Sequence, residues 1–269
     1  LVPLSHAALS RAIELNGVQV ASNHAAFEWG RRAAHDLAAV EALTATEQVI
    51  RIARQPSLDE LLARRVEFLT AYQDAAYAQR YRDFVERVRA AEAPLGSTRL
   101  AAAVARCLFK LMAYKDEYEV ARLHADPAFH ARLAAQFDGD VKLSYHLAPP
   151  LLARRNAQGE LQKRTYGAWM LSAFRLLARL KGLRGTAFDP FGRSEERRGE
   201  RAAIDEYRAD IEALLPALDA ARLGLAVEIA SLPEGVRGYG HVKARHLAET
   251  RARRAALLAR WHEATAAAA

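Results

Sequence analysis

Residues 57–72 read SLDELLARRVEFLTAY, and this stretch sets the class of fold. Ser57 and Glu60 stand at the spacing of a capping box, in which each side chain accepts a hydrogen bond from the other residue's backbone N–H. Aromatic residues continue the helical spacing to Ala93, and we interpret them as core residues rather than as a platform for stacking bases. The apolar residues that open this pattern, three or four positions apart, are Leu58, Leu61, Leu62, Val66 and Leu69.

Helix signals recur on both sides of this stretch. Ser5 predicts the start of a helix that Asn16-Gly17 ends, and a second short helix should cover residues 21–36. Downstream, Ser97 predicts the start of one long helix that runs to His124. Strands and helices do not alternate, so the sequence predicts an all-α, multi-helix, bundle-like domain.

One segment departs from this pattern. Residues 137–167 read FDGDVKLSYHLAPPLLARRNAQGELQKRTYG, with two prolines, three glycines and short alternating runs. A loop of this length within a compact domain is usually functional or disordered. Because leucine and tyrosine side chains recur along it, we expect an ordered loop or small hairpin around residues 136–167, with a turn near Asn156 to Gly159.

Composition limits the class of protein. The chain has 269 residues, of which 51% are hydrophobic, and this is enough to bury a substantial core. No uncharged apolar run is long enough to span a membrane, and no export signal is visible. Cys107 is the single cysteine, so an internal disulfide is excluded and a cytoplasmic location is expected.

Known catalytic and metal-binding motifs are missing from the sequence. There is no Walker lysine, no C-x-x-C and no H-E-x-x-H. The glycines of residues 235–240 follow the order G-x-x-G-x-G, the reverse of the dinucleotide-binding fingerprint, and the histidines do not pair at one-turn spacing. We therefore predict no catalytic residue and no metal site in this chain.

Asp116 is the acidic residue whose expected position conflicts with its charge. On the predicted long helix it shares an apolar face with Met112 and Val120. A buried, unpaired carboxylate is strongly unfavourable, so we expect Asp116 to form a structural ion pair, with a catalytic acid as the alternative. Candidate partners lie in residues 184–201, RGTAFDPFGRSEERRGER, and are Arg184, Arg193 and Arg197.

Four stretches resemble a known family when they are taken together. They are KDEYEVARLH at 115–124, YHLAPPLLAR at 145–154, YGAWMLSAFRLLARLKGLRGTAFDPFGRSEERRGER at 166–201 and LPEGVRGYGHVK at 232–243. They resemble the carboxy-terminal region of the fused indolepyruvate ferredoxin oxidoreductases, members of the 2-oxoacid:ferredoxin oxidoreductase family. The opening LVPLSHAALSRAIELNGVQVASNHAAFEWGRRAA resembles the end of that family's gamma-type catalytic domain.

The resemblance implies a division of the chain at residue 40. Residues 1–40 would be the end of the gamma-type domain, poorly packed without the rest of it, and residues 41–269 a carboxy-terminal helical domain. The chain begins Leu1-Val2-Pro3 without a methionine, and we expect it to be a piece of a longer polypeptide.

The resemblance also implies a parent enzyme. Such an enzyme oxidatively decarboxylates arylpyruvates with thiamine diphosphate and Mg²⁺, and it passes electrons through [4Fe-4S] clusters to ferredoxin. This chain has one cysteine and no G-D-G with a downstream asparagine, so we expect it to bind none of these cofactors itself. The implied partners are the upstream catalytic domains, ferredoxin and further copies of the parent.

Basic residues in two glycine-flanked stretches are the binding candidates. We expect them to line one electropositive recess that faces the catalytic core or an acidic ferredoxin, with a phosphate or coenzyme contact through Arg184, Arg193 or Arg197 as the alternative. These residues are Arg184, Arg193, Arg197, Arg237, His241 and Lys243.

A second function class stays open, namely a free-standing basic helical protein that binds nucleic acid. A net charge of +7 favours it, whereas the interleaving of arginine with glutamate and aspartate does not. This alternative predicts a start codon near Leu1 and salt-sensitive DNA binding, whereas the oxidoreductase reading predicts thiamine and cysteine-cluster motifs encoded upstream.

Overall fold

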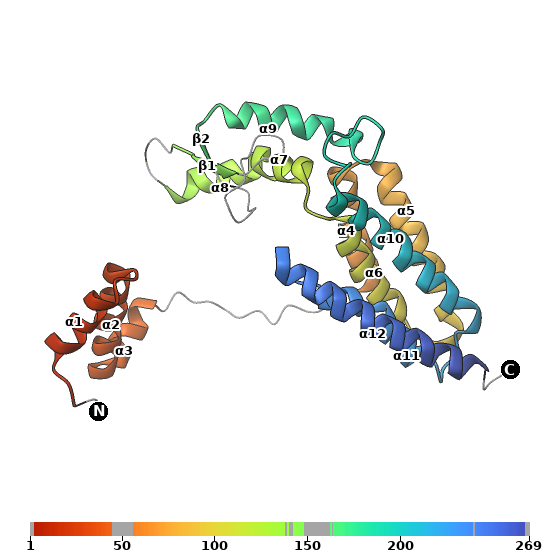
Figure 1. The fold of residues 1–269 in the computed structure, drawn as a ribbon, viewed down its shortest axis with the longest axis horizontal. Helices are drawn as coiled ribbons and strands as arrows, with labels where there is room; N and C mark the ends of the chain where they lie inside the picture. The colour runs from red at the N-terminus through yellow and green to blue at the C-terminus, as the bar shows by residue number, and fades with distance from the viewer. Residues whose placement is uncertain are drawn as a thin grey trace. The chain divides into compact units, whose positions relative to one another are not determined.

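The computed structural model describes residues 3–44, 56–137, 139, 142–147, 162, 164–238 and 240–266, with the side chains of residues 44 and 240–244 left out. Over these residues the protein is all-α apart from one two-stranded sheet, which confirms the predicted fold class. The chain forms two compact units, Leu1–Gln55 and Pro56–Ala269 (Figure 1). This division lies after the boundary predicted at residue 40, which falls inside a helix.

The amino-terminal unit contains α1 (His6–Asn16), α2 (Val20–His35) and α3 (Leu37–Thr44). The Ser5 hydroxyl caps α1 by accepting a hydrogen bond from the Ala8 N–H, and Gly17 ends it at a φ of 68°, as the sequence predicts. None of the described side chains in this unit is buried. Its exposed apolar residues include Leu15 and Trp29, which are 72% and 46% exposed.

The second unit is built on a bundle of six helices around α6. Leu100, Val104 and Leu108 of α6 are fully buried, and α6 packs against α4, α5, α10 and α11. The helices of this unit are α4 (Leu58–Tyr72), α5 (Ala75–Glu92), α6 (Arg99–Met112), α7 (Glu117–Ala125), α8 (Pro127–Gln136), α9 (Met170–Arg179), α10 (Glu195–Leu214), α11 (Leu223–Ala230) and α12 (Gly240–Ala266). Four 3-10 turns join them: η1 (Ala93–Leu95), η2 (Leu180–Leu183), η3 (Leu215–Ala217) and η4 (Leu232–Gly235).

The helical pattern that begins at Ser57 is divided into two helices. The predicted capping box of Ser57 and Glu60 is confirmed, with both of its hydrogen bonds present. The continuation of one helix past Tyr72 is wrong, because Asp74 accepts a hydrogen bond from the Tyr77 N–H at 2.7 Å and starts α5. The two helices then pack against each other. The helical spacing of the apolar residues does not reveal such a break, because the apolar residues on both sides of it face the same core.

The predicted long helix from Ser97 to His124 is also wrong. The chain leaves the helical path after Met112, and Asp116 caps a new helix by accepting a hydrogen bond from the Glu119 N–H at 2.8 Å. Buried tyrosine hydroxyls take the carbonyls exposed by this break: Tyr77 donates to Met112 O at 2.9 Å, and Tyr72 donates to Tyr114 O at 2.8 Å. The break therefore leaves these buried carbonyl groups with partners.

Glu92, the last residue of α5, caps the start of α6. Its carboxylate is fully buried and accepts hydrogen bonds from the Leu100 and Ala101 N–H groups, both at 2.9 Å. The first N–H groups of a helix have no partner within the helix and carry partial positive charge. A carboxylate from the end of α5 thus satisfies the start of α6 and fixes the turn between them.

A smaller apolar cluster forms where α7 packs on α9 and on a short sheet. Strands β1 (Tyr145–Leu147) and β2 (Arg164–Tyr166) pair antiparallel, with Tyr145 opposite Tyr166. Buried Phe174 stacks on the His124 ring, with centroids 4.9 Å apart. This pair of strands lies in the segment predicted as a loop or small hairpin, and the predicted turn at Asn156 to Gly159 lies outside the described residues.

Candidate functional site

A buried ion pair joins the two apolar clusters of the second unit. Arg184 donates from Nε to Asp116 Oδ2 at 2.5 Å and from Nη2 to Asp116 Oδ1 at 3.0 Å. The two side chains are 2% and 3% exposed. Arg184 also donates from Nη1 to Tyr72 O at 2.6 Å, and its guanidinium lies over the Tyr72 ring, 3.7 Å from the centroid. One side chain from the turn after η2 therefore binds both the end of α4 and the start of α7.

The surroundings of this pair favour the charged form of Arg184. Burial disfavours the charged form of Arg184, but the hydrogen bonds and the charge of Asp116 outweigh it, and the pKa of Arg184 is raised above its ordinary value. Asp116 Oδ1 also accepts the Glu119 N–H, so each carboxylate oxygen is hydrogen-bonded. The acid that could have served as a catalytic group is thus held in a structural pair, and Arg184 is its partner among the three arginines considered.

Cations gather at the carboxyl end of α4. Lys181 Nζ donates to Thr70 O at 3.2 Å and to Ala71 O at 2.7 Å, and Arg184 takes the next carbonyl, that of Tyr72. The last carbonyls of a helix carry partial negative charge and have no partner within the helix. Residues of η2 and the following turn therefore act as the carboxy-terminal cap of a helix more than 100 residues earlier.

The turn after Arg184 is organised around a second buried acid, Asp189. Its carboxylate accepts the Gly185 N–H at 2.8 Å, the Phe191 N–H at 3.0 Å and the Tyr118 hydroxyl at 3.2 Å. Gly192 is required here because a Cβ at this position would lie only 2.8 Å from Asp189 Cγ. Residues 184–194 thus form a tight, carboxylate-centred loop that leads into α10, which Ser194 caps by accepting a hydrogen bond from the Arg197 N–H.

The residues predicted to share one basic recess lie in different surroundings. Arg193 donates to Ala187 O at 3.1 Å and is exposed, whereas Arg197 pairs with Glu200 at 2.5 Å and lies 3.6 Å from Glu117. Arg237 donates to Glu234 O on η4.

His241 and Lys243 belong to α12, and their side chains lie outside the described part of the chain. Of the described members of the predicted recess, Arg184 and Arg193 line neighbouring hollows, and neither hollow is lined by Arg197 or Arg237.

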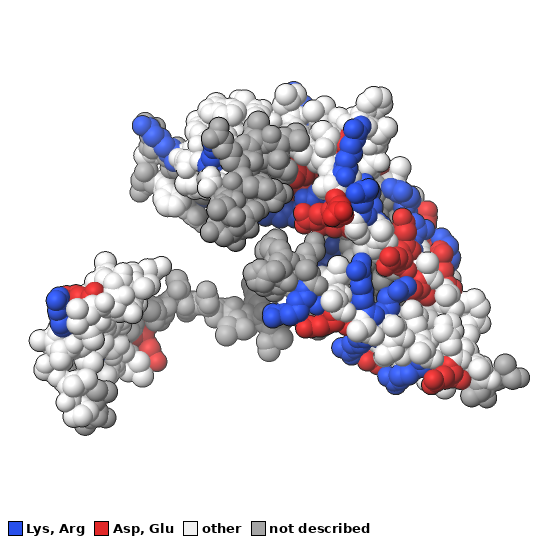
Figure 2. Space-filling view, in the orientation of Figure 1, with Lys and Arg blue, Asp and Glu red and all other residues white. Residues whose placement is uncertain are grey.

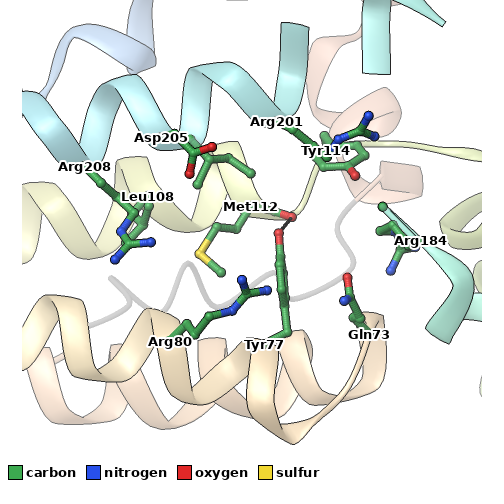
Figure 3. Close-up of a pocket in the computed structure, with 12 residues that line it drawn as sticks. Gln73, Tyr77, Arg80, Leu108, Met112, Tyr114, Arg184, Arg201, Asp205 and Arg208 are labelled. Atoms are coloured by element: carbon green, nitrogen blue, oxygen red, sulfur yellow. Dashed lines mark hydrogen bonds between the residues drawn. The ribbon is translucent and has the colours of Figure 1, made fainter. Parts of the chain in front are cut away.

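Two hollows flank the loop of residues 184–194. The first, about 220 Å³, lies between α5, α6 and α10, and Figure 3 shows Arg80 and Arg208 extending into it from opposite helices. The second, about 350 Å³, lies over the loop itself and includes Arg193 and Arg198. Gly185 and Arg201 line both. The charged residues of the first hollow are Arg80, Arg184, Arg201, Asp205 and Arg208.

Sequence reasoning missed three of these arginines. Arg201 and Arg208 are seven positions apart on α10 and so share one face, a signal that was present in the sequence. Arg80 carried no such signal, because only the packing of α5 beside α6 and α10 brings it to the same hollow.

The thiol of Cys107 does not fit an iron–sulfur cluster. A cluster needs several thiolates, whereas this is the single cysteine of the chain. Burial on α6 raises its pKa to about 11 and favours the protonated form. Among the described residues, no group of three or more His, Cys, Asp or Glu side chains gathers as metal ligands would. The same residues include no helix with the length and apolar character needed to cross a bilayer.

Comparison with known families places the chain. Residues 58–256, more than half of the sequence, match the family described as a family of unknown function, DUF6537. The chain belongs to this family. The match covers α4 to α11 and most of α12, and thus the Asp116–Arg184 pair and both hollows. Neither a comparison with curated proteins nor one with solved structures found a match.

Removing either member of the buried pair should destabilise the protein strongly. Asp116→Ala and Arg184→Met should each lower the free energy of unfolding by about 3–5 kcal/mol, because each leaves an uncompensated buried charge. The double variant should lose less than the sum of the two, as measured by urea denaturation. As a control, Asp59→Ala in the exposed Arg89–Asp59 pair should have a much smaller effect. Strict additivity at Asp116 and Arg184 would contradict the coupling.

Two glycines near the loop should respond oppositely to alanine. Gly192→Ala should lower the free energy of unfolding by about 1–3 kcal/mol, because the new methyl group meets the Asp189 carboxylate. Gly199→Ala should raise it by about 0.5–1 kcal/mol, because Gly199 is exposed within α10 and has open space around its Cα. Thermal denaturation of both variants checks the loop: equal effects would show that Asp189 is not held as described.

Proposed function

We propose that this chain is the carboxy-terminal helical, non-catalytic module of a thiamine-diphosphate-dependent indolepyruvate ferredoxin oxidoreductase of the cytoplasm. The observation that carries the proposal is where its resemblance to that family falls. Residues 115–124 supply Asp116 and residues 166–201 supply Arg184 and Asp189, so these stretches build the buried polar framework of the unit. A resemblance that falls on residues of the folded framework supports a module whose role is structural.

The buried acids support a structural role over a catalytic one. Asp116, Asp189 and Glu92 are each hydrogen-bonded to backbone N–H groups or to Arg184, and all three are buried. A general acid must reach the atom that it protonates. Chemistry on a 2-oxoacid, with its thiamine diphosphate and [4Fe-4S] clusters, is therefore assigned to the upstream segments of the parent.

The amino-terminal unit supports a role in assembly. Its described helices bury no side chain, yet Leu15, Val18, Trp29 and Leu43 expose apolar surface. Isolated short helices gain most of their stability from burying an apolar face against other structure. We assign that surface to contact with the upstream catalytic domain of the same polypeptide, within a homo-oligomeric parent.

Nucleic-acid binding is the competing function, and the distribution of charge disfavours it. On the face of the second unit that Figure 2 shows, acidic side chains lie among the basic ones. Arginines are paired with acids on several helices, as in Arg87–Glu212, Arg253–Glu228 and Arg254–Asp210. Tight binding to the phosphate backbone depends on unopposed positive charge. Salt-sensitive DNA binding by the purified chain, with no thiamine or cysteine-cluster motif encoded upstream, would overturn the proposal in favour of this alternative.

Contact with the parent should protect the amino-terminal unit. When the chain is part of the complete gene product, amide hydrogens of residues 6–35 should exchange at least about tenfold more slowly than in the chain alone, because packing suppresses local opening. Hydrogen exchange read by mass spectrometry makes the comparison. Residues 100–108 of α6 provide the control, since they are largely buried in either form. Equal exchange of residues 6–35 in both samples would contradict the assembly role.

Reversing the charge of Arg237 and Lys243 should slow electron transfer to ferredoxin. Ferredoxins are typically acidic, so replacing Arg237 and Lys243 by glutamate in the complete enzyme should slow ferredoxin reduction by about tenfold at low salt and flatten its ionic-strength dependence. Arg175→Glu on α9 is a matched control, because Arg175 is also exposed. If the rate of ferredoxin reduction kept the same salt dependence after charge reversal at Arg237 and Lys243, these two residues would be excluded from the contact with ferredoxin.

A further inference from the structure

The first hollow contains guanidinium groups without acidic partners. Arg80 lies over the Tyr77 ring, 4.9 Å from its centroid, and Arg208 lies over the Phe84 ring, 5.1 Å from its centroid. Within the described part of the chain, neither guanidinium forms an ion pair. Arg208 Nε is buried and has no hydrogen-bond acceptor among these residues. A buried donor without a partner is uncommon and marks a place where another group can bind.

The charges around this hollow do not balance. Asp116 neutralises Arg184, so the remaining basic groups are Arg80, Arg201 and Arg208, and one acid, Asp205, stands against them. Arg201 is held in place by its hydrogen bond to Gly192 O at 2.6 Å. Like charges that line one partly enclosed space raise the local potential and attract an anion.

We propose that this hollow binds a small dianion that presents several oxygens, such as a phosphate group. Guanidinium groups donate paired N–H bonds that match the oxygens of phosphate and carboxylate. A volume of about 220 Å³ is below the range typical of drug-sized ligands and suits a small acid or the phosphate of a larger molecule. Two positive charges in excess of Asp205 match the charge of a dianion.

The side chains around the hollow fit this occupant. The hydroxyl of Tyr77 is engaged with Met112 O, so the tyrosine contributes a rigid aromatic wall on which Arg80 rests. Arg80, Arg201 and Arg208 come from two helices that each pack on α6, and the bundle fixes their spacing before any ligand arrives. Prior positioning of rotamer-rich side chains reduces the entropy lost on binding. This site does not depend on which enzyme the chain belongs to.

Titration of the complete chain with inorganic phosphate tests the site. At fixed ionic strength in chloride, phosphate should bind in calorimetry and raise the melting temperature. Arg80→Gln and Arg208→Gln should each weaken phosphate binding by at least about tenfold, because each removes a paired donor. Arg82→Gln is the matched control on α5, since Arg82 is exposed and does not line the hollow. The Arg82→Gln variant should bind phosphate as tightly as the unsubstituted chain does.

Further arms distinguish the source of the anion and guard against misfolding. Arg208→Lys keeps the positive charge but loses the paired N–H donors of the guanidinium. It should bind phosphate more weakly than the unsubstituted chain, while its melting temperature in chloride stays close to that of the unsubstituted chain. Stronger binding of malonate than of phosphate would assign the hollow to dicarboxylates, which supports an oxyanion site of that kind. Absence of binding by either anion, or equal weakening by Arg82→Gln and Arg80→Gln, would overturn the proposal, because diffuse surface charge would then account for any effect.

Discussion

The pairing of Asp116 with Arg184 is the interaction on which the second unit depends. It lies where three segments meet, and it is one of the contacts that join the six-helix bundle to the smaller cluster of α7, α9 and the sheet. Breaking a buried pair leaves a charge that water cannot reach, whereas keeping it requires the end of α4 and the start of α7 to stay in register. The pair therefore fixes the positions of these segments relative to one another more than it adds net stability.

Side chains from other elements also bind the backbone at the end of α4 and at both ends of α6. Glu92 takes the first N–H groups of α6, Tyr72 and Tyr77 take carbonyls beyond its end, and Lys181 takes the last carbonyls of α4. Each partner comes from a different element, so the helix ends are satisfied only when the whole unit is assembled. Backbone groups that would be costly if left alone thereby make the arrangement of the helices specific.

The arginine-rich stretch of residues 184–201 covers the loop of residues 184–194 and the first turns of α10, and its arginines differ in role. Its first arginine is neutralised in the interior, and Asp189 orders the turn that follows. Arg201, farther along, faces the hollow that Arg80 and Arg208 complete from two helices. Arg184 and Arg201 thus lie in one stretch of sequence, but Arg184 pairs with a carboxylate, whereas Arg201 donates to the Gly192 carbonyl. The anion site and the module function are independent proposals, so either can stand without the other.

Local chemistry by itself determined the helical class and the caps at Ser5 and Ser57, because capping and the spacing of apolar residues act over a few residues. Only the tertiary structure decided the breaks after Tyr72 and Met112, since a helical period persists through a turn when both flanks face one core. It likewise decided which arginine pairs with Asp116 and which converge on the hollow. These choices join residues far apart in the chain, and no local pattern encodes which helix faces meet.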